Sequence, residues 1–122
     1  MILADTSIWI DHFRSGDAEL KKALNLGQVV IHPWVTAELA LVSLRDRTRT
    51  LAMLDRLPQM RMAQADELRT MIEARRLFNM GIGLTDIHLI ASVFLNPPTI
   101  LWTRDKQLRK VAESFRINVD LP

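Results

Sequence analysis

The chain has 122 residues, enough for one compact domain and too few for two of ordinary size. It contains no cysteine, so disulfides and cysteine-ligated metal sites are excluded, and any metal must be held by oxygen or imidazole ligands. Of its 16 basic residues, 12 are Arg, the side chain that forks onto phosphates, although the net charge is only +2.

Short apolar runs alternate with longer stretches of helical periodicity along the chain. We predict strands over residues 2–4, 29–31 and 99–102, with two further short candidates at 59–62 and 117–119. We predict helices over residues 7–13, 17–25, 34–43, 48–57, 66–79, 85–95 (capped by Thr85) and 105–114. Alternation of this kind is typical of an α/β fold, a sandwich around a short central parallel sheet.

Four acidic residues stand at informative positions relative to these elements. Asp5 directly follows the first predicted strand, and Asp105 comes three residues after Trp102, the end of another. Asp86 lies in the first turn of a helix, and Glu38 in a helix entered directly from a strand. Ligands of parallel sheets bind beyond the carboxyl ends of the strands, so we expect these acids to share one pocket there.

Each acid also has an ordinary structural interpretation. Asp5 and Asp105 are typical helix N-caps, and the negative charge of Asp86 is favoured in the first turn of a helix. Glu38 fits this interpretation less well, because apolar neighbours surround it in a helix that looks largely buried. The alternative for Glu38 is a solvent-facing position on a stripe with Arg45, or a pair with another Arg.

The four acids taken together favour a metal site. Carboxylates brought into one pocket repel one another, and a bound divalent cation neutralises this repulsion. Oxygen ligands without cysteine suit Mg²⁺ or Mn²⁺. Once these four carboxylates are set aside, the rest of the chain is basic, a balance that suits an enzyme acting on a polyanion.

Four sequence blocks resemble, in order, the motifs of PIN domains. They are DTSIWID at residues 5–11, TAEL at 36–39, GIGLTDIHLIA at 81–91 and LWTRD at 101–105. The resemblance covers essentially the whole chain, and it is closer still to the VapC toxins of bacterial type II toxin–antitoxin pairs. It implies a single PIN domain over residues 1–122 and a PIN-like three-layer α/β/α sandwich.

The resemblance also implies an activity and its site. PIN-domain VapC toxins are endoribonucleases that depend on Mg²⁺ or Mn²⁺, cut structured RNA such as tRNA or rRNA, form homodimers and are restrained by a VapB-like antitoxin. Carried over to this sequence, the catalytic acids are Asp5, Glu38, Asp86 and Asp105, of which Asp5, Asp86 and Asp105 hold metal. Hydroxyl side chains expected to line the pocket are Thr6, Ser7 and Thr103. Apart from the resemblance, Arg104, Lys106 and Arg109 lie beside Asp105 in the sequence, so we expect them to contact RNA phosphate.

Two other functions stay open from the residues alone. A phosphatase with a nucleophilic Asp typically needs a second Asp two residues after the first, where this chain has Ser7. A non-catalytic RNA- or partner-binding module could keep the same acidic pocket. The chain lacks a signal-peptide pattern and a long apolar stretch, so we expect a cytoplasmic protein without a membrane segment.

Overall fold

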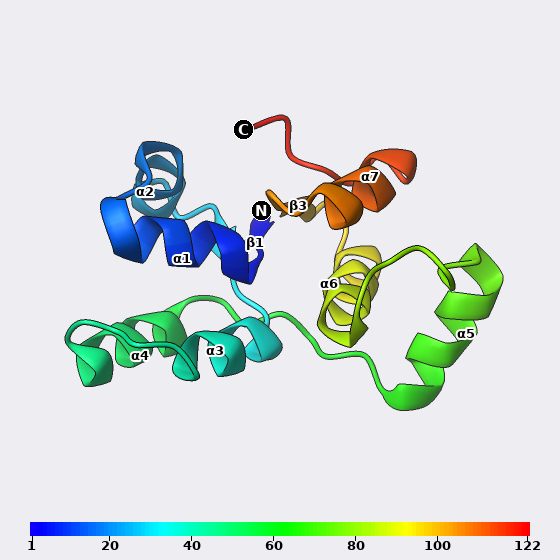
Figure 1. Ribbon diagram of the computed structural model, residues 1–122, viewed down its shortest axis with the longest axis horizontal. Helices are drawn as coiled ribbons and strands as arrows, with labels where there is room; N and C mark the ends of the chain where they lie inside the picture. The colour runs from blue at the N-terminus through cyan, green and yellow to red at the C-terminus, as the bar shows by residue number, and fades with distance from the viewer.

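The computed structural model describes all 122 residues of the chain (Figure 1). Three short strands are present: β1 (Ile2–Ala4), β2 (Val29–Val30) and β3 (Ile100–Trp102). The helices are α1 (Thr6–Ser15), α2 (Ala18–Asn25), α3 (Pro33–Ala40), α4 (Arg47–Arg56), α5 (Ala65–Arg75), α6 (Leu84–Leu95) and α7 (Lys106–Ser114). Every predicted helix and the three main strands are therefore present in the predicted order. None of the helices has the length and apolarity needed to cross a membrane.

The strands form one parallel sheet with the order β2-β1-β3. β1 lies in the middle, where Ile2 pairs with both Val29 and Ile100, and Ala4 pairs with Trp102. Because the strands are parallel, the residues that follow them meet at the same edge of the sheet. In Figure 1 the strands lie near the centre, with α1 and α2 on one side and α5, α6 and α7 on the other. This is the α/β/α arrangement that the PIN-domain resemblance implies.

A hydrophobic core of 27 buried residues holds the layers together. The two largest side chains in it, Trp9 of α1 and Trp102 of β3, are at most 1% exposed. Residues 87–93 of α6 are all buried, as expected of a mainly apolar helix whose one charged residue, Asp86, lies in its first turn. Close packing therefore fixes the first turn of α1, which follows Asp5, and the first turn of α6, which contains Asp86.

The two shorter predicted strands, 59–62 and 117–119, are not strands. Each is reduced to one isolated parallel bridge, Ile31 with Gln59 and Leu101 with Asn118. Pro58 lacks the N–H that would extend the first pairing. Arg116, just before the second segment, has a left-handed backbone with a φ of 57°, which interrupts an extended run.

Two predicted helix ends are wrong, and each has a local cause. α3 ends at Ala40 rather than at residue 43. Just after this end, the Arg47 side chain donates to the carbonyl oxygens of Ala40 and Val42 at 2.5 and 3.2 Å. A cationic donor on these free carbonyls stabilises the end of the helix. α5 ends at Arg75 rather than at residue 79, because Arg76 adopts a left-handed conformation with a φ of 54°.

His32 lies between β2 and α3 in the chain, and its side chain is part of the buried interior. Its side chain is fully buried, and its Nδ1 accepts the backbone N–H of Trp34 at 3.0 Å, which caps the helix. The other nitrogen, Nε2, has no hydrogen-bond partner, and the ring centroid of His88 lies 5.8 Å away. Burial, with a smaller effect of His88, lowers the pKa of His32 to about 4. The cap therefore depends on a neutral imidazole.

We expect the free energy of unfolding to fall as the pH drops from 6.5 towards about 4. In this range the unfolded chain binds a proton at His32 that the folded chain does not, so acid favours unfolding. The contribution is fully retained above pH 6.5, and its loss amounts to at most about 3 kcal/mol. Urea titrations at neutral and mildly acidic pH measure this effect.

His32→Asn is the matched control for this dependence. Asn keeps an oxygen that can cap α3, but it has no titrating ring. The variant should show a flatter dependence of stability on pH than the wild type. An equal dependence in both proteins would assign the acid sensitivity to other groups.

Candidate active site

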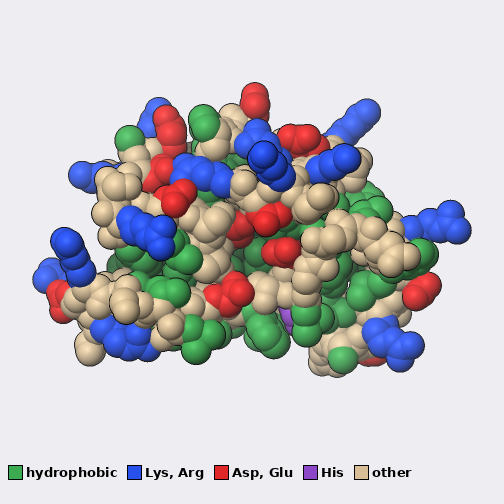
Figure 2. All heavy atoms as spheres, in the orientation of Figure 1, with side chains coloured by type: hydrophobic (Ala, Val, Ile, Leu, Met, Phe, Trp, Pro, Cys, Tyr) green, Lys and Arg blue, Asp and Glu red, His purple; other side chains and the backbone are tan.

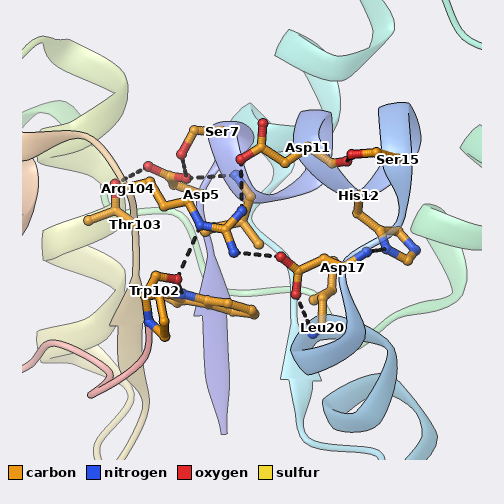
Figure 3. Close-up of polar contacts among 12 residues, drawn as sticks. Asp5, Ser7, Asp11, His12, Ser15, Asp17, Leu20, Trp102, Thr103 and Arg104 are labelled. Atoms are coloured by element: carbon orange, nitrogen blue, oxygen red, sulfur yellow. Dashed lines mark hydrogen bonds and ion pairs between the residues drawn. The ribbon is translucent and has the colours of Figure 1, made fainter.

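Asp5 lies at the end of the central strand and caps the start of α1. Its backbone N–H donates to the carbonyl oxygen of Trp102 at 2.9 Å, which fixes it against β3. The residue is only 6% exposed. Its Oδ1 accepts the Ser7 hydroxyl at 2.5 Å and the Ile8 N–H at 3.3 Å, and its Oδ2 accepts the Thr103 hydroxyl (Figure 3). Asp5 is thus both an N-cap and a buried carboxylate that faces the loop after β3.

No positive charge balances the Asp5 carboxylate. The five ion pairs of the structure involve other acids, so its partners are neutral hydroxyl and amide groups. Burial raises the pKa of Asp5, and the hydrogen bonds from Ser7, Thr103 and Ile8 offset part of that rise. A buried carboxylate held only by neutral donors can accept a cation as its counter-charge.

Glu38 reaches the same region from α3. Its Oε1 accepts the hydroxyl of Thr6, the first residue of α1, at 2.6 Å. The expectation that this helix is largely buried is wrong, because only Val35 and Leu39 are buried in it and Glu38 itself is half-buried. No Arg pairs with Glu38 either. A hydroxyl of the neighbouring helix holds this acid at the rim of the pocket.

Asp86 belongs to the first turn of α6. Its carboxylate accepts the backbone N–H of Gly83 at 3.4 Å, and Gly83 is the cap residue of the helix. The prediction that Thr85 caps α6 is wrong, because the helix already begins at Leu84. Asp86 is half-buried and lies at the positive end of the helix dipole, which favours its negative charge.

The charges of Asp105, Asp5 and Glu38 all act on Asp86, so the four acids lie near one another at this edge of the sheet. Burial is the largest cause of the raised pKa of Asp86, the N–H of Gly83 opposes it, and the charges of Asp105, Asp5 and Glu38 raise the pKa further. Figure 2 shows acidic side chains gathered across the middle of the face, over the strands of Figure 1, with Lys and Arg side chains above and beside them. The structure therefore brings together the four acids that the sequence singles out.

Asp105 lies at the exposed side of this pocket. Its Oδ1 accepts the N–H of Leu108 at 2.9 Å and caps α7, while its own N–H donates to the Thr103 hydroxyl at 3.1 Å. Thr103 is 3% exposed and donates the same hydroxyl to Asp5. One threonine thus connects the most buried acid to the most exposed one. The predicted pocket hydroxyls, Thr6, Ser7 and Thr103, each donate to one of the four acids.

The donors of the pocket fit a hard divalent cation. They are carboxylate and hydroxyl oxygens, and none of the carboxylates has a counter-charge. No group of three acidic or His side chains has the spacing to hold one ion directly. Repulsion keeps unneutralised carboxylates apart, and Mg²⁺ retains several waters when it binds proteins. Direct contact with one or two of these acids is therefore enough for such an ion.

The basic residues predicted to contact RNA phosphate are not equivalent. Arg104 donates to the carboxylates of Asp11 and Asp17. Arg109 donates to the carboxylate of Glu113 in the same helix and to the carbonyl oxygen of Leu121 in the C-terminal tail. Lys106 is exposed and forms no ion pair. Lys106 is thus the most available of the three, whereas a phosphate would have to displace two acids from Arg104. Sequence reasoning missed these two acids, which lie 93 and 87 residues from Arg104.

Acids gathered at the carboxyl edge of a parallel sheet define this chain as an α/β protein with a candidate cation site. The family model for the PIN domain matches residues 2–114. Two proteins named Ribonuclease VapC32, from Mycobacterium tuberculosis strains CDC 1551 / Oshkosh and ATCC 25618 / H37Rv, are each 42% identical over 109 residues, 89% of this chain and 88% of the relative. The chain belongs to the PIN-domain family and, within it, to the VapC group.

Removal of the buried charge of Asp5 should stabilise the metal-free protein. Asp5→Asn keeps an oxygen for the Ile8 N–H but no longer buries a charge. We expect Tm to rise by a few degrees, the shift that about 1 kcal/mol produces in a domain of this size. Mn²⁺ should raise Tm of the wild type and leave that of the variant unchanged, as measured by thermal unfolding with and without the ion.

Asp55→Asn is a control for the replacement of an Asp by an Asn at a position away from the four acids. Asp55 is exposed on α4 and forms no ion pair. Its variant should match the wild type both in Tm and in the response to Mn²⁺. If Asp5→Asn were less stable than the wild type in the absence of metal, the lost hydrogen bonds would outweigh the relief of the uncompensated charge at this position.

Proposed function

We propose that the chain is a metal-dependent endoribonuclease that acts as the toxin of a toxin–antitoxin pair. It hydrolyses RNA phosphodiester bonds, with tRNA or rRNA as substrate class, in the pocket of Asp5, Glu38, Asp86 and Asp105. The observation that carries the proposal is the buried Asp5 carboxylate, which has other acids beside it and no counter-charge. Membership of the PIN-domain family and the ribonuclease activity in the name of its VapC32 relatives support this reaction.

The proposed cofactor is Mg²⁺ or Mn²⁺ at Asp5, Asp86 and Asp105, of which one or two would contact the ion directly while the others act through its bound waters. A cation bound there would neutralise charge that develops on the phosphate and lower the pKa of a coordinated water. Thr103 supports two of these ligands at once, since its hydroxyl donates to Asp5 and accepts the N–H of Asp105. Ser7 holds the other oxygen of Asp5. These bonds orient the carboxylates before any ion or substrate arrives.

Glu38 is the one acid of the four that is not a proposed metal ligand, so it is available to accept the proton of the attacking water. Thr6 engages Oε1, which leaves Oε2 without a partner in the chain. A half-buried carboxylate at the rim can reach both the pocket and solvent. We therefore assign Glu38 Oε2 as the proton acceptor and Thr6 as the group that limits rotation of this carboxylate.

The proposed protein partner is a VapB-like antitoxin. A groove lies between α1 and the segment that joins α3 to α4. It is lined by apolar side chains and by two cations, namely Ile10, Phe13, Val42, Leu44, Arg14 and Arg45. An amphipathic segment with acidic residues suits this groove, because its apolar face is buried there while its acids pair with the two arginines.

We further propose that residues 1–122 form a single PIN domain, that two copies form a homodimer and that the protein acts in the cytoplasm. The family match over residues 2–114 supports a single domain. Large apolar side chains at the ends of α3 and the start of α6 support self-association, since Trp34, Leu41 and Leu84 are 36%, 86% and 59% exposed. tRNA and rRNA, the proposed substrates, are found in the cytoplasm.

Asp5→Asn should slow RNA cleavage at least about 100-fold, because the variant loses the central ligand of the proposed metal. Circular dichroism should show the same folded domain. EDTA should stop cleavage by the wild type, and Mg²⁺ or Mn²⁺ should restore it. Gel assays on bulk tRNA and rRNA measure the rates, with Asp55→Asn as the matched control. RNA binding without cleavage by the wild type would instead identify a non-catalytic module.

The wild-type chain should arrest bacterial growth when expressed alone and should be harmless when co-expressed with its antitoxin. Arg14→Glu should weaken the complex about tenfold or more, because it places like charges across the groove. Growth curves and calorimetric titration of the purified pair measure the two effects. An antitoxin that binds the variant as tightly as the wild type would move the docking site away from this groove.

A further inference from the structure

The loop between β3 and α7 is three residues long and carries two parts of the pocket. Thr103 donates its hydroxyl to Asp5 at one end of the loop. Asp105 caps α7 at the other end. Arg104 lies between them, so whatever fixes the Arg104 side chain also restricts its two neighbours.

The guanidinium of Arg104 is fixed from four directions. Its two terminal nitrogens donate to Asp11 at 2.7 Å and to Asp17 at 2.5 Å, as Figure 3 shows. Its Nε donates to the carbonyl oxygen of Pro122 at 3.1 Å, and its central carbon lies 5.5 Å from the ring centroid of Trp102. We call Arg104, Asp11 and Asp17 the Arg104 network. It joins the loop to α1 and to the start of α2.

Asp17 is a firm anchor for this network. Its side chain is 13% exposed, its Oδ1 caps α2 by accepting the Leu20 N–H at 2.9 Å, and its own N–H donates to His12 at 3.0 Å. Burial acts to raise the pKa of Asp17, but the hydrogen bond and charge of Arg104, with backbone N–H groups, outweigh it and lower the pKa. The hydrogen bond to Asp17 likewise raises the pKa of Arg104. Each partner thus stabilises the charged form of the other.

We infer that Arg104 is a positioning residue of the acidic pocket, which sets the loop carrying Thr103 and Asp105 against α1; the inference rests on the proposed function of that pocket. α1 begins directly after Asp5, and Asp11 lies on the same helix. The network therefore ties the exposed acid to the element that presents the buried one. A displacement of about 1 Å between groups that must meet one ion or substrate is enough to reduce a rate severely.

Three roles for Arg104 predict three different results. A positioning residue, when lost, weakens metal binding and lowers kcat while KM for RNA changes little. An RNA contact, when lost, raises KM and weakens RNA binding. A positive charge that merely lies near the pocket would, when removed, strengthen the binding of a cation, because a repulsion disappears.

Arg104→Lys and Arg104→Ala separate these roles. Lys keeps the charge but lacks the planar fork that spans two carboxylates. We expect both variants to bind Mn²⁺ about tenfold more weakly by calorimetry and to lose about tenfold in kcat, the size of effect known for groups that support metal ligands. RNA binding, measured in an Asp5→Asn background, should stay unchanged. Arg61→Ala, which removes the exposed ion pair with Glu67, is the matched control and should affect neither quantity.

Asp17→Asn tests the network from its other end. Asn still caps α2, but its ion pair with Arg104 is lost. Combined with Arg104→Ala it should cause no additional loss of Mn²⁺ affinity, because both changes break the same link. Fully additive losses would show that the two residues act independently and would overturn the inference.

Amide hydrogen exchange tests the link without metal or RNA. The Asp105 N–H should exchange faster in Arg104→Lys than in the wild type, while the Leu68 N–H inside α5 should be unchanged. This outcome does not require ribonuclease activity, so a failure of the proposed function is distinguishable from a failure of the inference. Unchanged exchange at Asp105, tighter Mn²⁺ binding, or a rise in KM alone would each overturn the positioning role.

Discussion

A carboxylate buried between a central strand and the helix that follows it must be stabilised by its surroundings, and Asp5 is stabilised entirely by neutral groups. One oxygen accepts Ser7 and the N–H of Ile8, and the other accepts Thr103. These bonds cap α1 and join it to the loop after β3, and none of them involves a cation. The charge itself stays uncompensated. The same residue can therefore stabilise the fold and bind a cation.

The structural and functional interpretations of the acids are not alternatives. Asp5 and Asp105 are N-caps, and Asp86 lies in a first helical turn. Each is placed at the positive end of a helix dipole, which lowers the cost of gathering like charges in one pocket. Glu38 lacks this help, since it lies inside α3, and a hydroxyl from α1 stabilises it instead. Three helix starts at one sheet edge thus place the acids of the proposed site as a consequence of the fold.

Local sequence predicts this part of the structure well, because strand ends, caps and first turns depend on neighbouring residues. The order of the elements, the parallel sheet and the convergence of the acids follow from it. The ends of α3 and α5 were not predictable in the same way. Arg47 ends α3 from the next helix, and Arg76 ends α5 through an unusual backbone conformation. Periodicity carries no information about either event.

Side-chain partners distant in the sequence were the least predictable. Arg104 next to Asp105 suggested a phosphate contact, yet its partners come from α1 and the α2 cap. His32 showed a similar limit: the His-Pro pair marks a helix start, but the use of Nδ1 as the cap and the burial that keeps it neutral depend on packing against α6. Residue type and spacing identify which groups are present, while tertiary structure decides what each group contacts.

The contacts of Arg104 also explain how a basic chain keeps an acidic pocket free of its own cations. Arg104 is adjacent to Asp105 in sequence, so it is a natural counter-ion for the pocket acids. Asp11 and Asp17 instead draw its guanidinium away, and no ion pair of the structure includes a pocket acid. With two acids on one cation, the network carries a net negative charge and does not oppose a divalent ion nearby. The network that positions the loop thereby leaves the pocket acids available to an external cation.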